Sequence, residues 1–487
     1  MTSRALLLGV DACELSFVRA HLGALPTFAR LLDGGACHLL RSTAEHISAS
    51  VWPSFYTGEP PGANGVSQHL QWDPAEMRMR RITDDWLYCE PFWYALARAG
   101  LGVTVADVPF TFRNREPRAT EVGNWGSHDL MGRLQATTPA LRREVRRRFG
   151  RHPMGYEIPV EKGSGQLATM RAELVAGARR KGELVSWLRD TTDWNLLLAV
   201  FGECHRAGHI LWRDEGVERH AHVPPGALLE VYRAVDRALG EVLAGVDERT
   251  TSVVVFALHG MGSNHGQDHF VRRALDRLHA RDRQRERPAR TGGVVRALRE
   301  RLPARLQHAV ARAVPVEVRD WVVAREVTGG LDWRRTPGFA LRADLHGFLR
   351  LNLVGRERDG LLERGSDEHR RYVDRLIAAF TALRAVETGM PILRDVVAAQ
   401  ETLQGERAHL LPDFILRWNA QHPATRVHSD ELGTIEAMPE TGRTGEHRTG
   451  GFAIVRGPLA GGDGAPPLAH NQDFPRFVAH LLGRPAA

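Results

Sequence analysis

Continuous apolar runs of strand length recur along the chain, and each of them is followed by polar residues. They cover residues 4–10, 102–109, 195–201 and 252–258. Runs of this kind are typical of parallel strands that are buried on both faces. Amphipathic stretches with helical spacing lie between them, at residues 25–35, 91–99 and 228–243. This alternation predicts an α/β protein with a mainly parallel central sheet and helices on its faces.

Titratable side chains stand at the carboxyl ends of three of these predicted strands. Asp11 follows the first run directly, Glu203 and His205 follow the third, and His259 follows the fourth. Asp11 alone would be explained equally well as the cap of the next helix. The carboxyl ends of parallel strands share one edge of a sheet, however, so we expect these side chains to meet.

The segment 202–209, GECHRAGH, has the spacing of a metal site. His205 and His209 are four residues apart, so on a helix their rings project from one face and can bind one ion. Glu203 can either bind the same ion or hold a histidine ring through its other nitrogen. A single histidine is more often a core residue, but two histidines and a glutamate directly after a buried strand favour a metal site.

A second candidate segment, residues 46–65, begins as a hydroxyl-rich loop and continues as a short helix. Its aromatic residues have helical spacing, and the Pro- and Gly-rich turn at 58–62 ends the helix. Ser48 and Ser50 therefore lie at the start of the helix, where free N–H groups favour an anion. Either serine can serve as a helix cap or, beside an activating partner, as a nucleophile.

The charge and the apolar content do not point to nucleic acid or to a membrane. The net charge is +7, yet all but two of the 65 basic residues are arginine, which indicates codon bias rather than a binding surface. The apolar run at the N-terminus is too short for a signal peptide, and no uncharged run has the length of a membrane span. We expect a cytoplasmic protein whose four cysteines are reduced.

The composition changes between residues 266 and 332, where arginines cluster and amphipathic stretches cover 294–302 and 306–314. We expect a helical insertion here, a cap on a catalytic core formed by 1–265 and 333–487. Beyond it, 348–354 alternates like a half-buried strand. The substrate is expected to contact residues from separate loops, namely Trp125, His128 and Arg356.

Taken together, these stretches resemble the alkaline phosphatase superfamily and, within it, the type I phosphodiesterase and nucleotide pyrophosphatase branch. The resemblance rests on Asp11, SASVWPSFYTGEPPGANG at 48–65, GECHRAGH at 202–209, HGM at 259–261 and GEHRTGG at 445–451. It implies an alkaline phosphatase-like core, a mainly parallel sheet flanked by helices. It also implies two metal ions, usually zinc, and a Thr or Ser nucleophile that forms a covalent intermediate.

The family pattern implies a role for each matching residue. The distance to the Thr-Gly pair at 57–58 selects Ser48 rather than Ser50 as the nucleophile, which also contacts a metal. The residues implied as metal ligands are Asp11, Ser48, Glu203, His205, His209, His259 and His447.

Two positions depart from the family pattern. Leu258 stands where the family has an aspartate before the HGM histidine, so one metal position loses a ligand. His205 replaces the carboxylate of the Asp-x-x-x-His motif, which makes the site more positive and favours an anionic substrate.

The leading hypothesis is a metal-dependent phosphoric ester hydrolase, a phosphodiesterase that acts through a covalent Ser48 intermediate on a small anionic molecule. Zinc is the expected ion, as one or two equivalents, with manganese or iron as alternatives. Two other hypotheses remain open: a transferase or sulfatase-like enzyme of the same fold with one metal, and a binding protein that has lost a metal site.

Overall fold

The structure is a computed structural model, and it describes residues 3–127, 133–155, 163–282, 316–343, 345–439, 442–458 and 464–484. Its largest sheet has eight strands, and the strands β9, β1, β8, β5 and β6 in its middle run parallel. In spatial order the strands are β2 (Ala36–Leu40), β19 (Gly451–Arg456), β9 (Thr251–Ala257), β1 (Arg4–Val10), β8 (Leu196–Phe201), β5 (Val103–Ala106), β6 (Ala119–Gly123) and β7 (Gln135–Ala136). The predicted α/β fold with a mainly parallel central sheet is confirmed.

The two faces of this sheet bury two separate hydrophobic cores. Leu6 and Leu8 of β1 point into one core and Ala5 and Leu7 into the other, since successive side chains of a strand alternate between faces. The first core is covered by α2 (Pro26–Gly34), α6 (Pro139–Phe149), α7 (Ser164–Thr191), α8 (Glu203–Leu211) and α9 (Ala227–Leu243). The second is covered by α3 (Val51–Thr57), α5 (Phe92–Arg98) and α16 (Phe474–Leu481). We call the sheet and these helices the first lobe.

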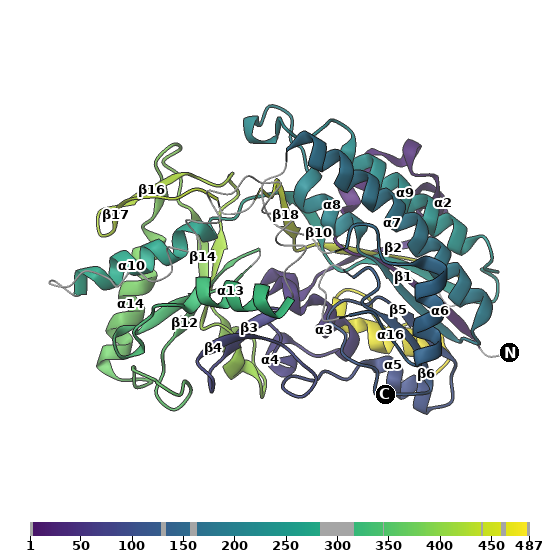
Figure 1. The fold of residues 1–487 in the computed structure, drawn as a ribbon, viewed down its shortest axis with the longest axis horizontal. Helices are drawn as coiled ribbons and strands as arrows, with labels where there is room; N and C mark the ends of the chain where they lie inside the picture. Colours follow the sequence, from purple (N-terminus) through teal and green to yellow (C-terminus); the bar gives the residue numbers. More distant parts are fainter. Residues whose placement is uncertain are drawn as a thin grey trace.

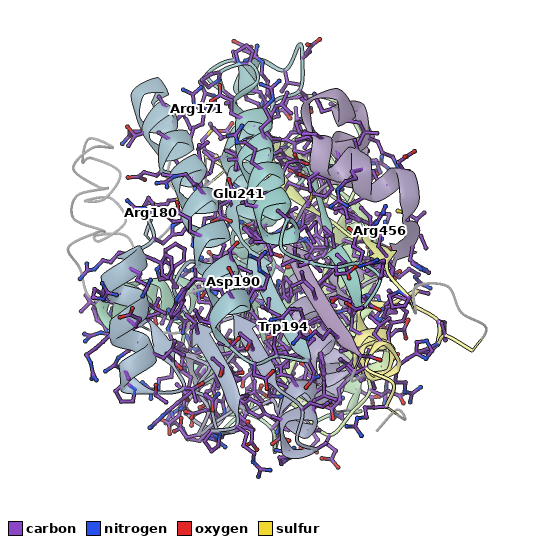
Figure 2. All side chains as sticks on the ribbon, turned by 90° about the vertical axis from the view of Figure 1, so that its right-hand side faces the viewer. Arg171, Arg180, Asp190, Trp194, Glu241 and Arg456 are labelled. Atoms are coloured by element: carbon purple, nitrogen blue, oxygen red, sulfur yellow. The ribbon has the colours of Figure 1, made fainter. Side chains whose placement is uncertain are left out.

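The long helices α7 and α9 run side by side on the outside of the first lobe. Figure 2 shows them from this side, with Arg171, Arg180 and Asp190 on α7 and Glu241 on α9. Their facing sides are apolar and buried, whereas charged side chains cover the side turned to solvent. This pattern is that of an amphipathic helix pair.

A second lobe lies at the left of Figure 1 and is built mainly from later residues. Its four-stranded antiparallel sheet contains β11 (Gly338–Leu341), β12 (Gly347–Leu351), β15 (Phe414–Trp418) and β14 (Leu393–Ala398). A smaller sheet contains β13 (Arg384–Ala385), β16 (Arg426–Ser429) and β17 (Gly433–Glu436), and the helices are α10 (Val271–Asp282), α13 (Val316–Thr328), α14 (Asp367–Thr381) and α15 (Ala399–Thr402). The hairpin of β3 (Leu70–Asp73) and β4 (Arg78–Arg81) packs against α13.

One hydrophobic core of the second lobe contains residues from both sides of the expected boundary between 332 and 333. Leu275 and Leu278 of α10 share one buried cluster with Leu349 of β12 and Phe380 of α14. Residues from both sides of the expected boundary therefore pack as one unit. The stretches 294–302 and 306–314, which were expected to be helical, lie outside the described residues.

Three strand ends of the first lobe carry a left-handed backbone at residues other than glycine. Ala12 follows β1 with φ 52°, Asp107 follows β5 with φ 55°, and Asn124 follows β6 with φ 58°. Such conformations are unfavourable for residues with a Cβ atom and persist where surrounding contacts enforce them. All three residues lie at the same edge of the sheet, where the sequence predicts the candidate site residues.

None of the helices among the described residues is long and apolar enough to cross a membrane.

Candidate metal centre

Three imidazole rings converge where α8 meets the short ribbon of β10 (Gly260–Ser263) and β18 (Gly445–Arg448). Nε2 of His205 lies 3.0 Å from Nε2 of His209 and 3.3 Å from Nε2 of His447. The first two residues lie one helical turn apart on α8, as their spacing predicts, and His447 comes from β18. All three side chains are buried.

The opposite nitrogens of two of these rings determine where their protons lie. Nδ1 of His205 lies 2.9 Å from Oδ2 of Asp11, and Nδ1 of His209 lies 3.1 Å from the carbonyl oxygen of Gly445. Both acceptors require a proton on Nδ1, so the Nε2 lone pairs face the centre of the cluster. Lone pairs about 3 Å apart repel one another unless a cation lies among them.

Burial keeps His209 in the form that a metal ion requires. Its pKa is well below the ordinary value, first because the ring is buried and then because Arg443, His205 and His447 add positive charge around it. Metal ions bind neutral imidazole. We call His205, His209 and His447 the three-histidine site. Its donors are of the type that divalent ions bind, and two overlapping groups with closely spaced donor atoms surround it, His205 with His259 and His447, and His209 with Glu446 and His447.

Asp11 and His259 form the neighbouring part of the cluster. Oδ1 of Asp11 accepts a hydrogen bond from Nε1 of Trp52 at 3.0 Å and lies 3.5 Å from Nε2 of His259. His259 also belongs to a potential ligand group with His205 and His447. Leu258, next in the chain, is fully buried in the apolar core and offers no ligand atom. This part of the cluster has fewer available donors than the three-histidine site.

Ser48 and Ser50, which the sequence left as alternatives, lie in different surroundings. They bound a short 3₁₀ turn, Ser48–Ser50, that leads directly into α3. The Ser50 hydroxyl is fully buried and hydrogen-bonds Ser54 at 3.2 Å and Asn64 at 3.5 Å. Among the described residues, none of the hydrogen bonds found uses the Ser48 hydroxyl. Ser48 precedes Trp52 by one helical turn, and Trp52 holds Asp11.

Two glycines let α8 approach the ribbon closely enough for the rings to meet. A Cβ atom on Gly208 would lie 2.5 Å from Cγ of Met261, and one on Gly445 would lie 2.1 Å from the carbonyl oxygen of Gly208. Met261 pairs with His447 across the ribbon, and its N–H donates to Oε2 of Glu14 at 3.2 Å. Side chains at these two positions would push His209 away from His447.

Glu203, which was expected either to bind the same ion or to hold a histidine ring, contacts His152, a histidine outside the cluster. Its Oε1 lies 3.1 Å from Nε2 of His152. Burial alone would raise the pKa of Glu203, but the His152 hydrogen bond and the charges of Lys181 and Arg206 lower it. Glu203 points away from His205 because residues two apart on a helix point in nearly opposite directions.

Glu203 belongs to a fully buried polar network behind α8. Arg206 donates to the carbonyl oxygens of Gly126 and Ser127, at 3.0 and 2.8 Å, and Lys181 forms an ion pair with Asp107. Asp107 also accepts the N–H groups of Trp125 and Gly126. Buried charges are stable where they are paired and hydrogen-bonded in this way.

The residues nominated for substrate contact do not gather at the cluster. Trp125 is buried in the first-lobe core, and its Nε1 donates to the carbonyl oxygen of Gly150 at 3.1 Å. Arg356 lies in the second lobe, where both terminal nitrogens bond Asp413 at 2.7 Å and Nε bonds Glu357. Both side chains already have structural partners, so neither supports the nomination. His128 lies outside the described residues.

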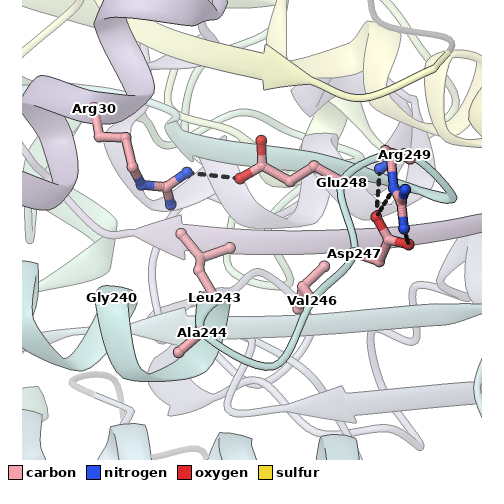
Figure 3. A pocket seen from close by; sticks show the side chains of 8 residues that line it. All are labelled: Arg30, Gly240, Leu243, Ala244, Val246, Asp247, Glu248 and Arg249. Carbon is pink, nitrogen blue, oxygen red and sulfur yellow. Dashed lines mark hydrogen bonds and ion pairs between the residues drawn. The ribbon is translucent and has the colours of Figure 1, made fainter.

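A cavity of about 480 Å³ lies at the opposite edge of the sheet, before the start of β9 (Figure 3). Its charged side chains pair with one another, Arg30 with Glu248 at 2.7 Å and Asp247 with Arg249 at 2.9 Å. The strand-end cluster is at the other end of β9, so this cavity is not part of it.

The structure is thus an α/β protein with a mainly parallel central sheet and a cluster of histidines at its strand ends. Residues 5–333 match the type I phosphodiesterase / nucleotide pyrophosphatase family, and the chain belongs to this family. The predicted family is therefore confirmed, and the chain is an enzyme of the phosphoester hydrolase class. A comparison with curated protein sequences found no match.

Two solved structures of one enzyme show the same fold at low sequence identity. Phosphonoacetate hydrolase from Sinorhizobium meliloti 1021, in complex with phosphonoacetate, is 16% identical with a TM-score of 0.54, over 99% of this chain and 96% of that chain. The same enzyme with phosphonoformate is 17% identical with the same TM-score and coverage. Murine ectonucleotide pyrophosphatase / phosphodiesterase 5, in complex with AMP, is 12% identical with a TM-score of 0.49, over 100% and 96% of the two chains.

Proposed function

We propose that the protein is a metal-dependent phosphodiester hydrolase in which Ser48 is the nucleophile. The observation that carries this proposal is the approach of three histidine rings at the strand ends, which Asp11 and Trp52 link to the turn that bears Ser48. A phosphoryl group is anionic, so a metal ion held by these rings would suit its transfer to a serine hydroxyl.

His205, His209 and His447 would hold the ion, and three imidazoles with an open fourth position suit zinc. When bound, the ion neutralises phosphate oxygens and favours the ionised form of a nearby hydroxyl. Asp11 fixes the orientation of the His205 ring through the 2.9 Å contact with Nδ1. Trp52 holds the carboxylate of Asp11 in turn.

Ser48 would attack phosphorus as its hydroxyl proton passes to a water molecule, and the leaving oxygen would take up a proton from water. The bond from Oγ to phosphorus forms while the bond from phosphorus to the leaving ester oxygen breaks, which produces a phosphoester of Ser48. Water then attacks the same phosphorus and restores the serine. Ser50 is a poorer candidate because its hydroxyl is already bonded to Ser54 and Asn64.

We further propose that the enzyme works with one bound ion. The supporting observation is the difference between the two parts of the cluster: both Asp11 oxygens have protein partners, and Leu258 is apolar. Removal of the ion with a chelator should abolish hydrolysis, and re-addition of one equivalent of zinc should restore it. Retained hydrolysis in the metal-free protein would contradict metal dependence.

The decisive test compares Ser48→Ala with Ser50→Ala on bis(p-nitrophenyl) phosphate. Ser48→Ala should lower kcat by roughly 1,000-fold or more with an unchanged metal content, because the attacking atom is lost. Ser50→Ala should keep most of the activity and lose only about 1 kcal/mol of stability, because a buried hydrogen bond is removed.

A Ser48→Ala enzyme with wild-type activity would remove Ser48 from the mechanism. The substrate panel should include p-nitrophenyl sulfate, and an added alcohol as acceptor, to separate hydrolysis from the sulfatase-like and transferase alternatives. Phosphonoacetate belongs in the panel because an enzyme of the same fold binds it.

A further inference from the structure

A second group of potential metal ligands lies apart from the three-histidine site and shares none of its residues. Asp214, His220 and His422 each place one ligand atom within 4.8 Å of the others. The first two come from the connection between α8 and α9 in the first lobe, and His422 comes from the connection between β15 and β16 in the second. The group therefore bridges the two lobes.

The contacts within this group hold each side chain in place. Oδ1 of Asp214 accepts from Nε1 of Trp212 at 2.9 Å, while Oδ2 lies 3.8 Å from Nδ1 of His220. Nδ1 of His220 accepts the N–H of Asp214 at 3.1 Å, a donor that a bound ion would replace. One oxygen of the carboxylate is therefore fixed by Trp212, and the other remains directed at His220.

His422 is positioned from the second lobe through its backbone and through Ser263. Its Nδ1 lies 3.4 Å from the Ser263 hydroxyl, and its carbonyl oxygen accepts from Nε2 of Gln267 at 3.2 Å. Ser263 also bonds the side chain of Asp214. The hydroxyl is thus in contact with ligand residues from both lobes and can complete the coordination of an ion.

His220 is unusual for a loop residue because its ring is only 1% exposed. Among the described residues its Nε2 has no hydrogen-bond partner, although the atom is buried. An imidazole nitrogen held 3.8 Å from a carboxylate oxygen is an arrangement that suits a metal ligand.

We propose that Asp214, His220 and His422 form a second metal site, which takes a divalent transition metal and joins the two lobes. Two imidazoles and one carboxylate suit zinc or cobalt better than calcium or magnesium, which prefer oxygen ligands. Arg448 interacts electrostatically with Asp214, and its positive charge opposes a cation. This site therefore binds more weakly than the three-histidine site, and a chelator empties it first.

The first test counts metal equivalents in the metal-free full-length protein titrated with Co²⁺ and, separately, with Zn²⁺. The wild type should bind one more equivalent than His422→Ala, and Asp214→Asn should weaken the second equivalent roughly tenfold or more. His428→Ala is the matched control, since His428 is exposed and lies outside the group. His209→Ala should lose the tighter equivalent and keep the weaker one.

The second test needs no variant of the site. Diethyl pyrocarbonate modifies accessible histidines, and Zn²⁺ should protect His422 in the wild type while His428 still reacts. The proposal is wrong if His422→Ala and Asp214→Asn bind as many equivalents as the wild type at the same affinity. It is also wrong if zinc leaves the modification of His422 unchanged. Hydrolysis should persist in His422→Ala, so this outcome is separate from the catalytic proposal.

Discussion

The two parts of the candidate centre contain similar kinds of residues but differ in what their atoms already bind. At the three-histidine site, the outward Nδ1 atoms of His205 and His209 have acceptors, which leaves Nε2 lone pairs for an ion. Beside it, the Asp11 oxygens face Trp52 and His205, and Leu258 contributes no donor. The comparison teaches that a metal site depends on available lone pairs as well as on the number of ligand-type residues.

The largest expected effect is the removal of a ring from the three-histidine site. His209→Ala should lose the tightly bound ion and lower kcat/KM by roughly 100-fold or more, because metal affinity falls steeply when the coordination is disturbed. Metal content by elemental analysis and hydrolysis of bis(p-nitrophenyl) phosphate measure the two effects. The matched control is Glu203→Gln, on the opposite side of α8, which should keep the ion.

This pair of variants also tests the assignment of Glu203. If Glu203→Gln loses the ion as completely as His209→Ala does, the carboxylate acts on the metal and the distinction between the two sides of α8 fails.

The second largest expected effect is a gain of metal binding. Leu258→Asp would supply the carboxylate that the Asp11 and His259 part of the cluster lacks, so the variant should bind one more zinc equivalent than the wild type. Leu258→Asn is the control for burying a polar group at this position, and it should not gain that equivalent. An unchanged stoichiometry in a folded Leu258→Asp protein would show that a missing carboxylate is not what limits this position.

The smallest effect concerns the link between Ser48 and the cluster. Trp52→Phe removes the donor to Asp11 and should weaken metal binding by about tenfold, because the carboxylate that orients His205 is no longer held. Phe55→Leu is the packing control, since Phe55 lies in the same buried core and its ring meets that of Trp52 edge to face. Equal losses of affinity in both variants would assign the effect to packing.

The sequence predicted the parts of the fold and site that depend on local spacing. The apolar runs became β1, β5, β8 and β9, and the four-residue spacing of His205 and His209 placed both rings on one side of α8. Helical geometry could also have predicted the direction in which the Glu203 side chain points. Residues 203 and 206 are three apart and therefore share the side that faces His152, away from residue 205.

Contacts between distant segments could not be predicted from the sequence. The buried cluster that α10 shares with β12 and α14 was not predicted, because hydrophobic pattern does not reveal which apolar faces meet. The sequence suggested that Arg356 contacts an anionic substrate. In the structure its partner is Asp413, which lies far along the chain. The meeting of His220 with His422 is equally non-local and carries no sequence signal of its own.

The lysine of the buried Lys181–Asp107 ion pair can serve as a chemical probe of local opening. The chain has two lysines, Lys162 and Lys181, and the second is fully buried between α7 and the sheet. Its amine is shielded from reagents as long as α7 stays packed. Acylation of Lys181, read by peptide mass, therefore reports the opening of the layer that supports α8, without any engineered probe.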